Sequence, residues 1–176
     1  MSFEKPTENI RFPQVASEIQ QMIDVDQTMR EQNAEDDSWD EEVDVRHANR
    51  MKELVEEIGW PTTSKVGEKA AYSAWLLVQH ADHDVDFQLY CLQLMKEAPT
   101  SEVSITNVAY LEDRVRVDQG LGQLYGTQFT QENNQHVPRP IEDEETVDER
   151  RAEIGMGPLS EQIEHMYNKY PFKEEK

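Results

Sequence analysis

Residues 75–84 of the chain read Trp75-Leu76-Leu77-Val78-Gln79-His80-Ala81-Asp82-His83-Asp84. The first four residues continue an apolar segment that starts near Ala70, which predicts a helix at the centre of the core. Two histidines and two aspartates follow directly. Buried imidazole and carboxylate groups need partners, because an unpaired one costs several kcal/mol. The stretch therefore predicts either a polar network that stabilises the core or a functional site.

Helical periodicity extends to both sides of this stretch. It predicts helices over about 14–32, 42–58, 65–81, 83–97, 104–118 and 144–154, and a last helix after Pro158. In the helix over 42–58 we expect Val45, Ala48, Val55 and Ile58 to face inward. Asp82 would cap the helix that begins at His83.

The periodicity is lost after Gly120, where aromatic and β-branched residues become frequent. We expect an antiparallel β-hairpin at about 123–141, with its turn at Glu132-Asn133-Asn134-Gln135. The predicted fold is mainly α, a single-domain helical bundle with one small β-hairpin. It would comprise a polar arm at 1–13, the domain at 14–170 with an acidic linker at 32–44, and a tail at 171–176.

Acidic residues are concentrated in two segments. Seven lie between Gln32 and Asp44 and six between Glu142 and Glu149, in a chain of net charge −20. Without these thirteen the charge would be about −7, an ordinary value for a soluble domain. We expect both segments to be exposed, as solvated surface or as a surface for a basic protein partner. Direct binding to nucleic acid is disfavoured, because no basic patch is present.

The compartment is indicated by what the sequence lacks. The single cysteine, Cys91, excludes an internal disulfide and falls on the apolar side of a predicted helix. No apolar run approaches the roughly 20 residues of a membrane span, and the first residues carry no apolar signal segment. We expect a cytoplasmic protein of a microbe that does not bind membranes.

His80 is the first candidate for chemistry, because it continues the inward face of Leu77 at the polar end of the apolar helix. A histidine beside a carboxylate can act as a general base. Asp113 is the first candidate partner and Asp26 the second. Asp26 lies within an apolar stripe, one turn before Arg30. We expect His80 and Asp113 to be catalytic in an enzyme, with a ligand-binding set of Asp26, Arg30, Arg114, Tyr125, Thr127 and Gln128.

A divalent metal is the alternative for the same region. His47, His83 and Asp84, followed downstream by Asp113 or Asp118, imitate the order of histidine and aspartate ligands in all-α metal phosphohydrolases. His80 and His83 could also hold zinc at a spacing of one helical turn, together with Asp84 or Asp86. Adjacent His-Asp pairs are common by chance, so the metal site ranks below the pocket around His80.

A set of motifs is spread along most of the chain: Asp26-Gln27 with Arg30, Gly59-Trp60-Pro61-Thr62, Val66-Gly67, residues 74–82, Phe87-Gln88, Tyr110-Leu111 with Asp113-Arg114-Val115, Tyr125-Gly126-Thr127-Gln128, residues 138–143 and Arg150-Arg151. Together these motifs resemble a bacterial family of unknown function, DUF6624, over about residues 14–165. The resemblance implies a bacterial or phage origin but no activity. Two classes of function stay open: an enzyme or binder of a small ligand at His80, and an acidic module that engages a basic protein.

Overall fold

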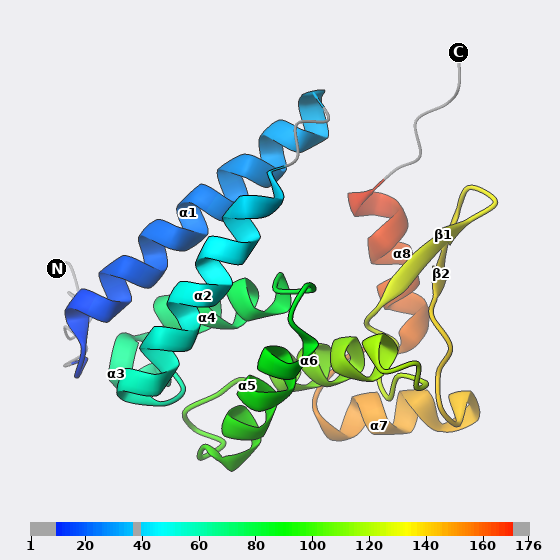
Figure 1. Ribbon diagram of the computed structural model, residues 1–176. Helices are drawn as coiled ribbons and strands as arrows, with labels where there is room; N and C mark the ends of the chain where they lie inside the picture. The colour runs from blue at the N-terminus through cyan, green and yellow to red at the C-terminus, as the bar shows by residue number, and fades with distance from the viewer. Residues whose placement is uncertain (1–9, 37–39, 171–176) are drawn as a thin grey trace, which may run out of the picture. The chain divides into compact units, whose positions relative to one another are not determined.

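The computed structural model describes residues 10–36 and 40–170, and the fold is mainly α with one small hairpin (Figure 1). The described chain divides into two compact units, one ending at Val103 and one beginning at Ser104. The proposed tail and most of the proposed arm lie outside the described residues. None of the described helices is long and apolar enough to cross a membrane.

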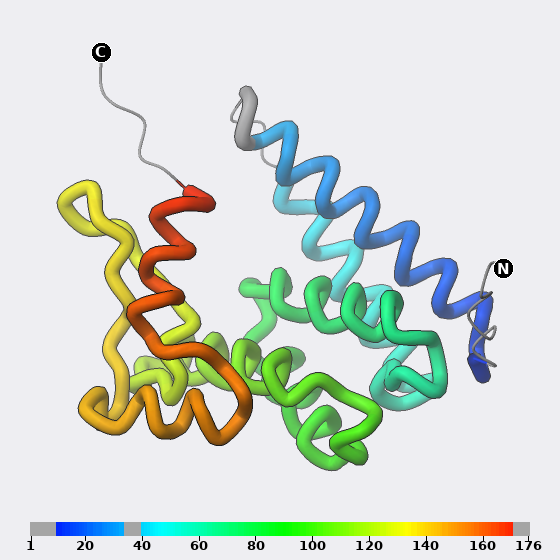
Figure 2. The backbone as a smooth tube through the Cα atoms, turned by 180° about the vertical axis from the view of Figure 1, so that it is seen from behind, coloured from blue at the N-terminus to red at the C-terminus, as the bar shows by residue number. Residues whose placement is uncertain are grey.

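The first unit contains five helices: α1 (Pro13–Asp36), α2 (Glu41–Ile58), α3 (Thr63–Val66), α4 (Glu68–Gln79) and α5 (Val85–Glu97). The apolar helix α4 is central, because α1, α2, α3 and α5 all pack against it. Figure 2 shows α4 beside α1 and α2 from the opposite side. Ala74, Trp75 and Val78 of α4 are buried, as is Cys91 of α5.

Four details of this unit differ from the sequence prediction. Most of the expected acidic linker is helical, since α1 continues to Asp36 and Asp40 caps α2 by accepting a hydrogen bond from the Glu42 amide at 3.0 Å. Val45 is 40% exposed rather than inward. The sequence predicts one continuous helix over 65–81, but Gly67 separates α3 from α4. Its φ of +82° lies outside the helical region and is a backbone angle that few residues other than glycine adopt. The cap of α5 is Asp84 rather than Asp82, with its carboxylate 3.0 Å from the Phe87 amide.

The second unit contains α6 (Ile105–Asp118), β1 (Phe129–Glu132), β2 (Gln135–Pro138), the 3-10 helix η1 (Glu144–Thr146), α7 (Val147–Glu153) and α8 (Leu159–Lys169). Ser104 caps α6, which falls within the helix that the sequence predicts over about 104–118. The strands are antiparallel, with Thr130 opposite Val137. Asn133 and Asn134 form the turn with φ of +50° and +58°, the positive values that a tight hairpin requires.

Residues 123–128 are a loop rather than the first strand of the hairpin. Gln123 meets Ile141 in a single bridge, and its side-chain oxygen accepts a hydrogen bond from the Gln128 amide at 2.8 Å. Gly126 has φ +70°, and a Cβ atom there would lie 2.6 Å from Leu159 Cδ1. The backbone conformation favours glycine at this position, and any larger residue would also have to displace the Leu159 side chain.

Candidate functional site

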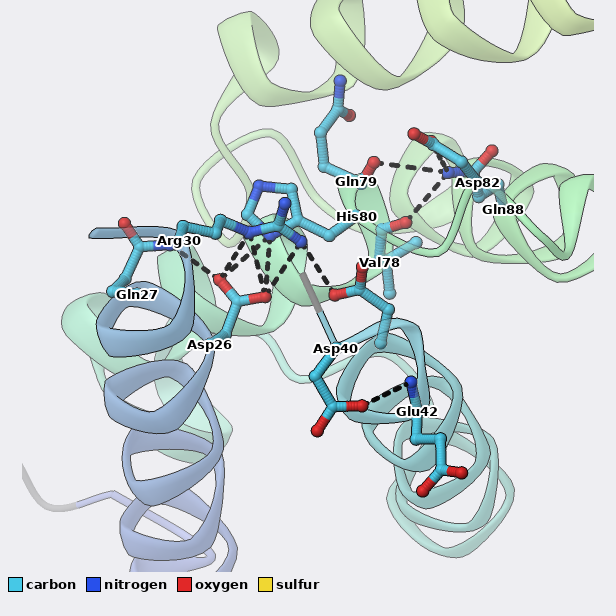
Figure 3. Close-up of polar contacts among 11 residues, drawn as sticks. Asp26, Gln27, Arg30, Asp40, Glu42, Val78, Gln79, His80, Asp82 and Gln88 are labelled. Atoms are coloured by element: carbon cyan, nitrogen blue, oxygen red, sulfur yellow. Dashed lines mark hydrogen bonds and ion pairs between the residues drawn. The ribbon is translucent and has the colours of Figure 1, made fainter. Parts of the chain in front are cut away.

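His80 lies at the C-terminal end of α4 and faces α1 (Figure 3). Its Nδ1 atom is 3.0 Å and 3.1 Å from the two carboxylate oxygens of Asp26. An ionised carboxylate can only accept hydrogen bonds, so Nδ1 carries the proton and donates. The opposite nitrogen, Nε2, makes no hydrogen bond to the described residues and is not among their buried unpaired atoms. The His80 side chain is 18% exposed, so the ring is shielded but reachable.

Asp26 is fully buried on α1 and accepts hydrogen bonds from three side chains. Besides His80, these are Arg30, with Nη2 at 3.1 Å, and Gln27, with Nε2 at 2.7 Å. Burial alone would raise the pKa of Asp26, but the hydrogen bonds from His80 and Arg30 outweigh it and hold that pKa well below its usual range. Asp26 is therefore an anion at neutral pH.

Arg30 extends the network to α2 through Asp44, whose Oδ1 atom is 2.8 Å from Arg30 Nη2. Burial raises the pKa of Asp44, and the attraction of Arg30 opposes that rise. Asp44 was not predicted as a site residue, because it belongs to an acidic run that is expected to be exposed. The signal was its place one turn before His47 and Ala48, both buried on the inner face of α2.

His47 is 9% exposed, and its Nδ1 atom is buried with no hydrogen-bond partner among the described residues. Burial lowers the pKa of His47, and the charge of Asp26 opposes this. The structure does not assemble the metal alternative of His47, His83 and Asp84. No three metal-binding side chains of the described chain lie close enough to hold an ion. Asp84 instead caps α5 and pairs with Lys52, and His83 is exposed.

Asp113 belongs to the second unit and is fully buried. Its carboxylate accepts hydrogen bonds from the amides of Leu124, Tyr125 and Thr127, at 2.6, 3.1 and 3.0 Å, and from Thr127 Oγ1 at 3.0 Å. Burial raises the pKa of Asp113, and these donors oppose it. These donors reach both oxygens, so Asp113 organises the loop.

The remaining predicted ligand residues also lie in the second unit. Tyr125 and Thr127 belong to the loop held by Asp113, and the Gln128 side chain donates to Thr127 Oγ1 at 2.9 Å. Arg114 follows Asp113 on α6 and is half-buried. The structure thus groups Asp26, Arg30 and His80 in one unit, and Asp113, Tyr125, Thr127 and Gln128 in the other.

Two adjacent arginines hold the other side of the same loop. Arg151 is buried and donates to the carbonyl oxygens of Tyr125 and Gly157, both at 2.6 Å. Arg150 donates to the Leu124 carbonyl at 2.8 Å. Sequence reasoning assigned neither residue a role, because arginine on a short helix gives no sign of a carbonyl partner 26 residues away.

The fold and this geometry define a mainly helical protein with a buried carboxylate–imidazole–guanidinium network in its first unit. A family model described as Family of unknown function (DUF6624) matches residues 13–175. The chain belongs to this family. Searches with this chain found no significant match among the curated proteins or the solved structures.

Proposed function

We propose that the first unit binds a small polar ligand at His80 and that His80 accepts a proton from it. The main support for this proposal is the contact of 3.0 Å between His80 Nδ1 and the buried Asp26. The other ring nitrogen, Nε2, has no hydrogen-bond partner in the described chain. The carboxylate fixes the tautomer that has its lone pair on Nε2. A ring held in this way needs little reorganisation when a hydroxyl, an amine or water donates to it.

The charges of the network support a proton acceptor. With His80 neutral, Asp26 and Asp44 carry two negative charges and Arg30 one positive charge, which leaves one net negative charge. Uptake of a proton by His80 brings the group to neutrality, and the imidazolium then faces an anionic carboxylate that remains ionised. A ligand with a hydrogen-bond donor fits this site better than an anion such as phosphate.

The tautomer can be measured directly. Long-range ¹⁵N–¹H correlation spectra should show that the neutral His80 imidazole has its proton on Nδ1 and its lone pair on Nε2. An Asp26→Asn variant should lose this preference, because an amide can offer either a donor or an acceptor. A proton found on Nε2 in the parent protein would refute the proposed role.

Ligand binding is tested by amide chemical shifts against a panel of small alcohols, phenols and amines. We expect at least one member to shift the signals of His80 and Arg30, and His80→Ala to abolish the effect. His83→Ala is the matched control, because His83 is exposed and lies three residues away. Equal responses of the two variants, or no response to the whole panel in the parent, would contradict a ligand site at His80.

A further inference from the structure

The helices α1 and α2 run side by side (Figure 1). Their side chains leave an open groove of about 610 Å³. We infer that this groove docks a cationic amphipathic helix of a partner protein. The inference goes beyond the proposed ligand site and does not depend on it, because Asp26, Arg30 and His80 do not line the groove.

The floor and one wall of the groove are apolar. Met29 of α1 and Val43 of α2 are nearly buried, whereas Val25 is 50% exposed. An exposed valine beside a hollow is an unfilled contact for an apolar side chain. The lining residues of α1 run from Asp24 to Gln32, about 12 Å of helix, so the groove can receive apolar side chains one turn apart on a partner helix.

The rim of the groove is acidic. Asp24 and Asp40 line it and are exposed, and the adjoining first turn of α2 adds Glu41 and Glu42. Arg46 is the one cation in the lining, and it pairs with Glu42 at 3.7 Å. The surface therefore complements lysine and arginine side chains that flank an apolar face. The same charge repels nucleic-acid phosphates and anionic lipid surfaces.

The probe for this surface is a synthetic helical peptide of about 14 residues, or roughly 21 Å, with leucine on one face and lysine on the other. Binding is followed by fluorescence anisotropy of the labelled peptide and by amide shifts of the full-length protein. We expect micromolar, salt-sensitive binding, with shifts at Val25, Met29 and Val43. A scrambled peptide of the same composition has no apolar face and should bind at least about tenfold more weakly.

Two valine variants separate docking from general attraction. Val25→Lys should lower the affinity for the peptide by about tenfold or more, because it places a charge among the apolar residues of the groove. Val45→Lys is the matched control, since Val45 is also exposed on the acidic part of α2 but does not line the groove. It should change the affinity by less than about twofold. His80→Ala should bind as the parent does, so failure of the ligand site and failure of the groove are distinguishable.

Three results would overturn the inference. One is no binding at millimolar peptide. Another is equal binding of the scrambled peptide, and the third is equal weakening by Val25→Lys and Val45→Lys, either of which would show that charge alone attracts the peptide.

Discussion

The carboxylate of Asp26 and the imidazole of His80 lie 3.0 Å apart although 54 residues separate them in the chain. Through this contact the middle of α1 is fixed to the end of α4, and Arg30 joins both to Asp44 of α2. Three helices of the first unit therefore meet at one buried anion. We expect the network to contribute to stability whether or not a ligand binds there, and substitutions can measure how much each member contributes.

Asp26→Asn should destabilise the protein by roughly 1–3 kcal/mol. The substitution replaces a fully buried carboxylate with an amide, which has one acceptor oxygen and cannot accept hydrogen bonds from both His80 and Arg30 as the carboxylate does. Urea denaturation measures the change in the free energy of unfolding. Asp24→Asn is the control on the same helix, and as an exposed residue it should change stability by about 0.5 kcal/mol or less. Equal effects of the two substitutions would mean that the network is not stabilising.

His80→Ala should reduce stability by less than about 1 kcal/mol, because Arg30 and Gln27 still donate to Asp26 when the imidazole is removed. Its unfolding is compared with that of Asp26→Asn under the same conditions. A loss as large as that of Asp26→Asn would assign His80 to structure and weigh against the proposed ligand site.

His47 should make stability depend on pH. Burial lowers the pKa of His47 in the folded protein, so the unfolded chain takes up a proton first, near its ordinary value of about 6.5. The contribution of this residue is therefore present above that pH and is lost as the pH falls through it. As the pH falls from about 7 to 5, we expect the unfolding free energy of the parent to decrease relative to that of His47→Phe, which has no imidazole to protonate. A difference that is constant with pH would rule out the buried neutral imidazole.

Two glycines of the second unit allow backbone strain to be separated from crowding. Gly126 and Gly120 have φ of +70° and +74°, but an added Cβ atom meets Leu159 only at Gly126 and nothing within 4 Å at Gly120. Gly120→Ala should cost about 1 kcal/mol from the backbone alone. Gly126→Ala should cost about 2 kcal/mol or more, because the Leu159 and Ile141 side chains must also shift. Thermal unfolding of the two variants tests the order, and equal costs would argue against close packing of α8 on the loop.

Local signals predicted most of the helices. The apolar run before His80, the Ser104 cap and the proline before α8 act within a turn of chain, so the sequence displays them. The errors arose where two local choices compete. Asp82 and Asp84 are both able to cap a helix, and Gly67 interrupts a segment whose composition is otherwise continuous.

The candidate site was predictable only in part. Asp26 and Arg30 are visible as a polar pair within the apolar stripe of one helix, and His80 as the polar end of another. The bond from Arg30 to Asp44 crosses between helices, and only the position of Asp44 one turn before the buried His47 and Ala48 distinguishes it from its exposed acidic neighbours. The role of Asp113 was equally hidden, because its partners are main-chain amides that any residue could supply.

The burial of Cys91 has a practical consequence. It is the only thiol in the chain, it is fully buried, and burial raises its pKa far above the range in which a thiol reacts. A cysteine introduced at an exposed position would therefore be the only one that takes a maleimide dye or a spin label, without prior removal of the native residue. With one such label in each unit, the distance between the two units could be measured in solution.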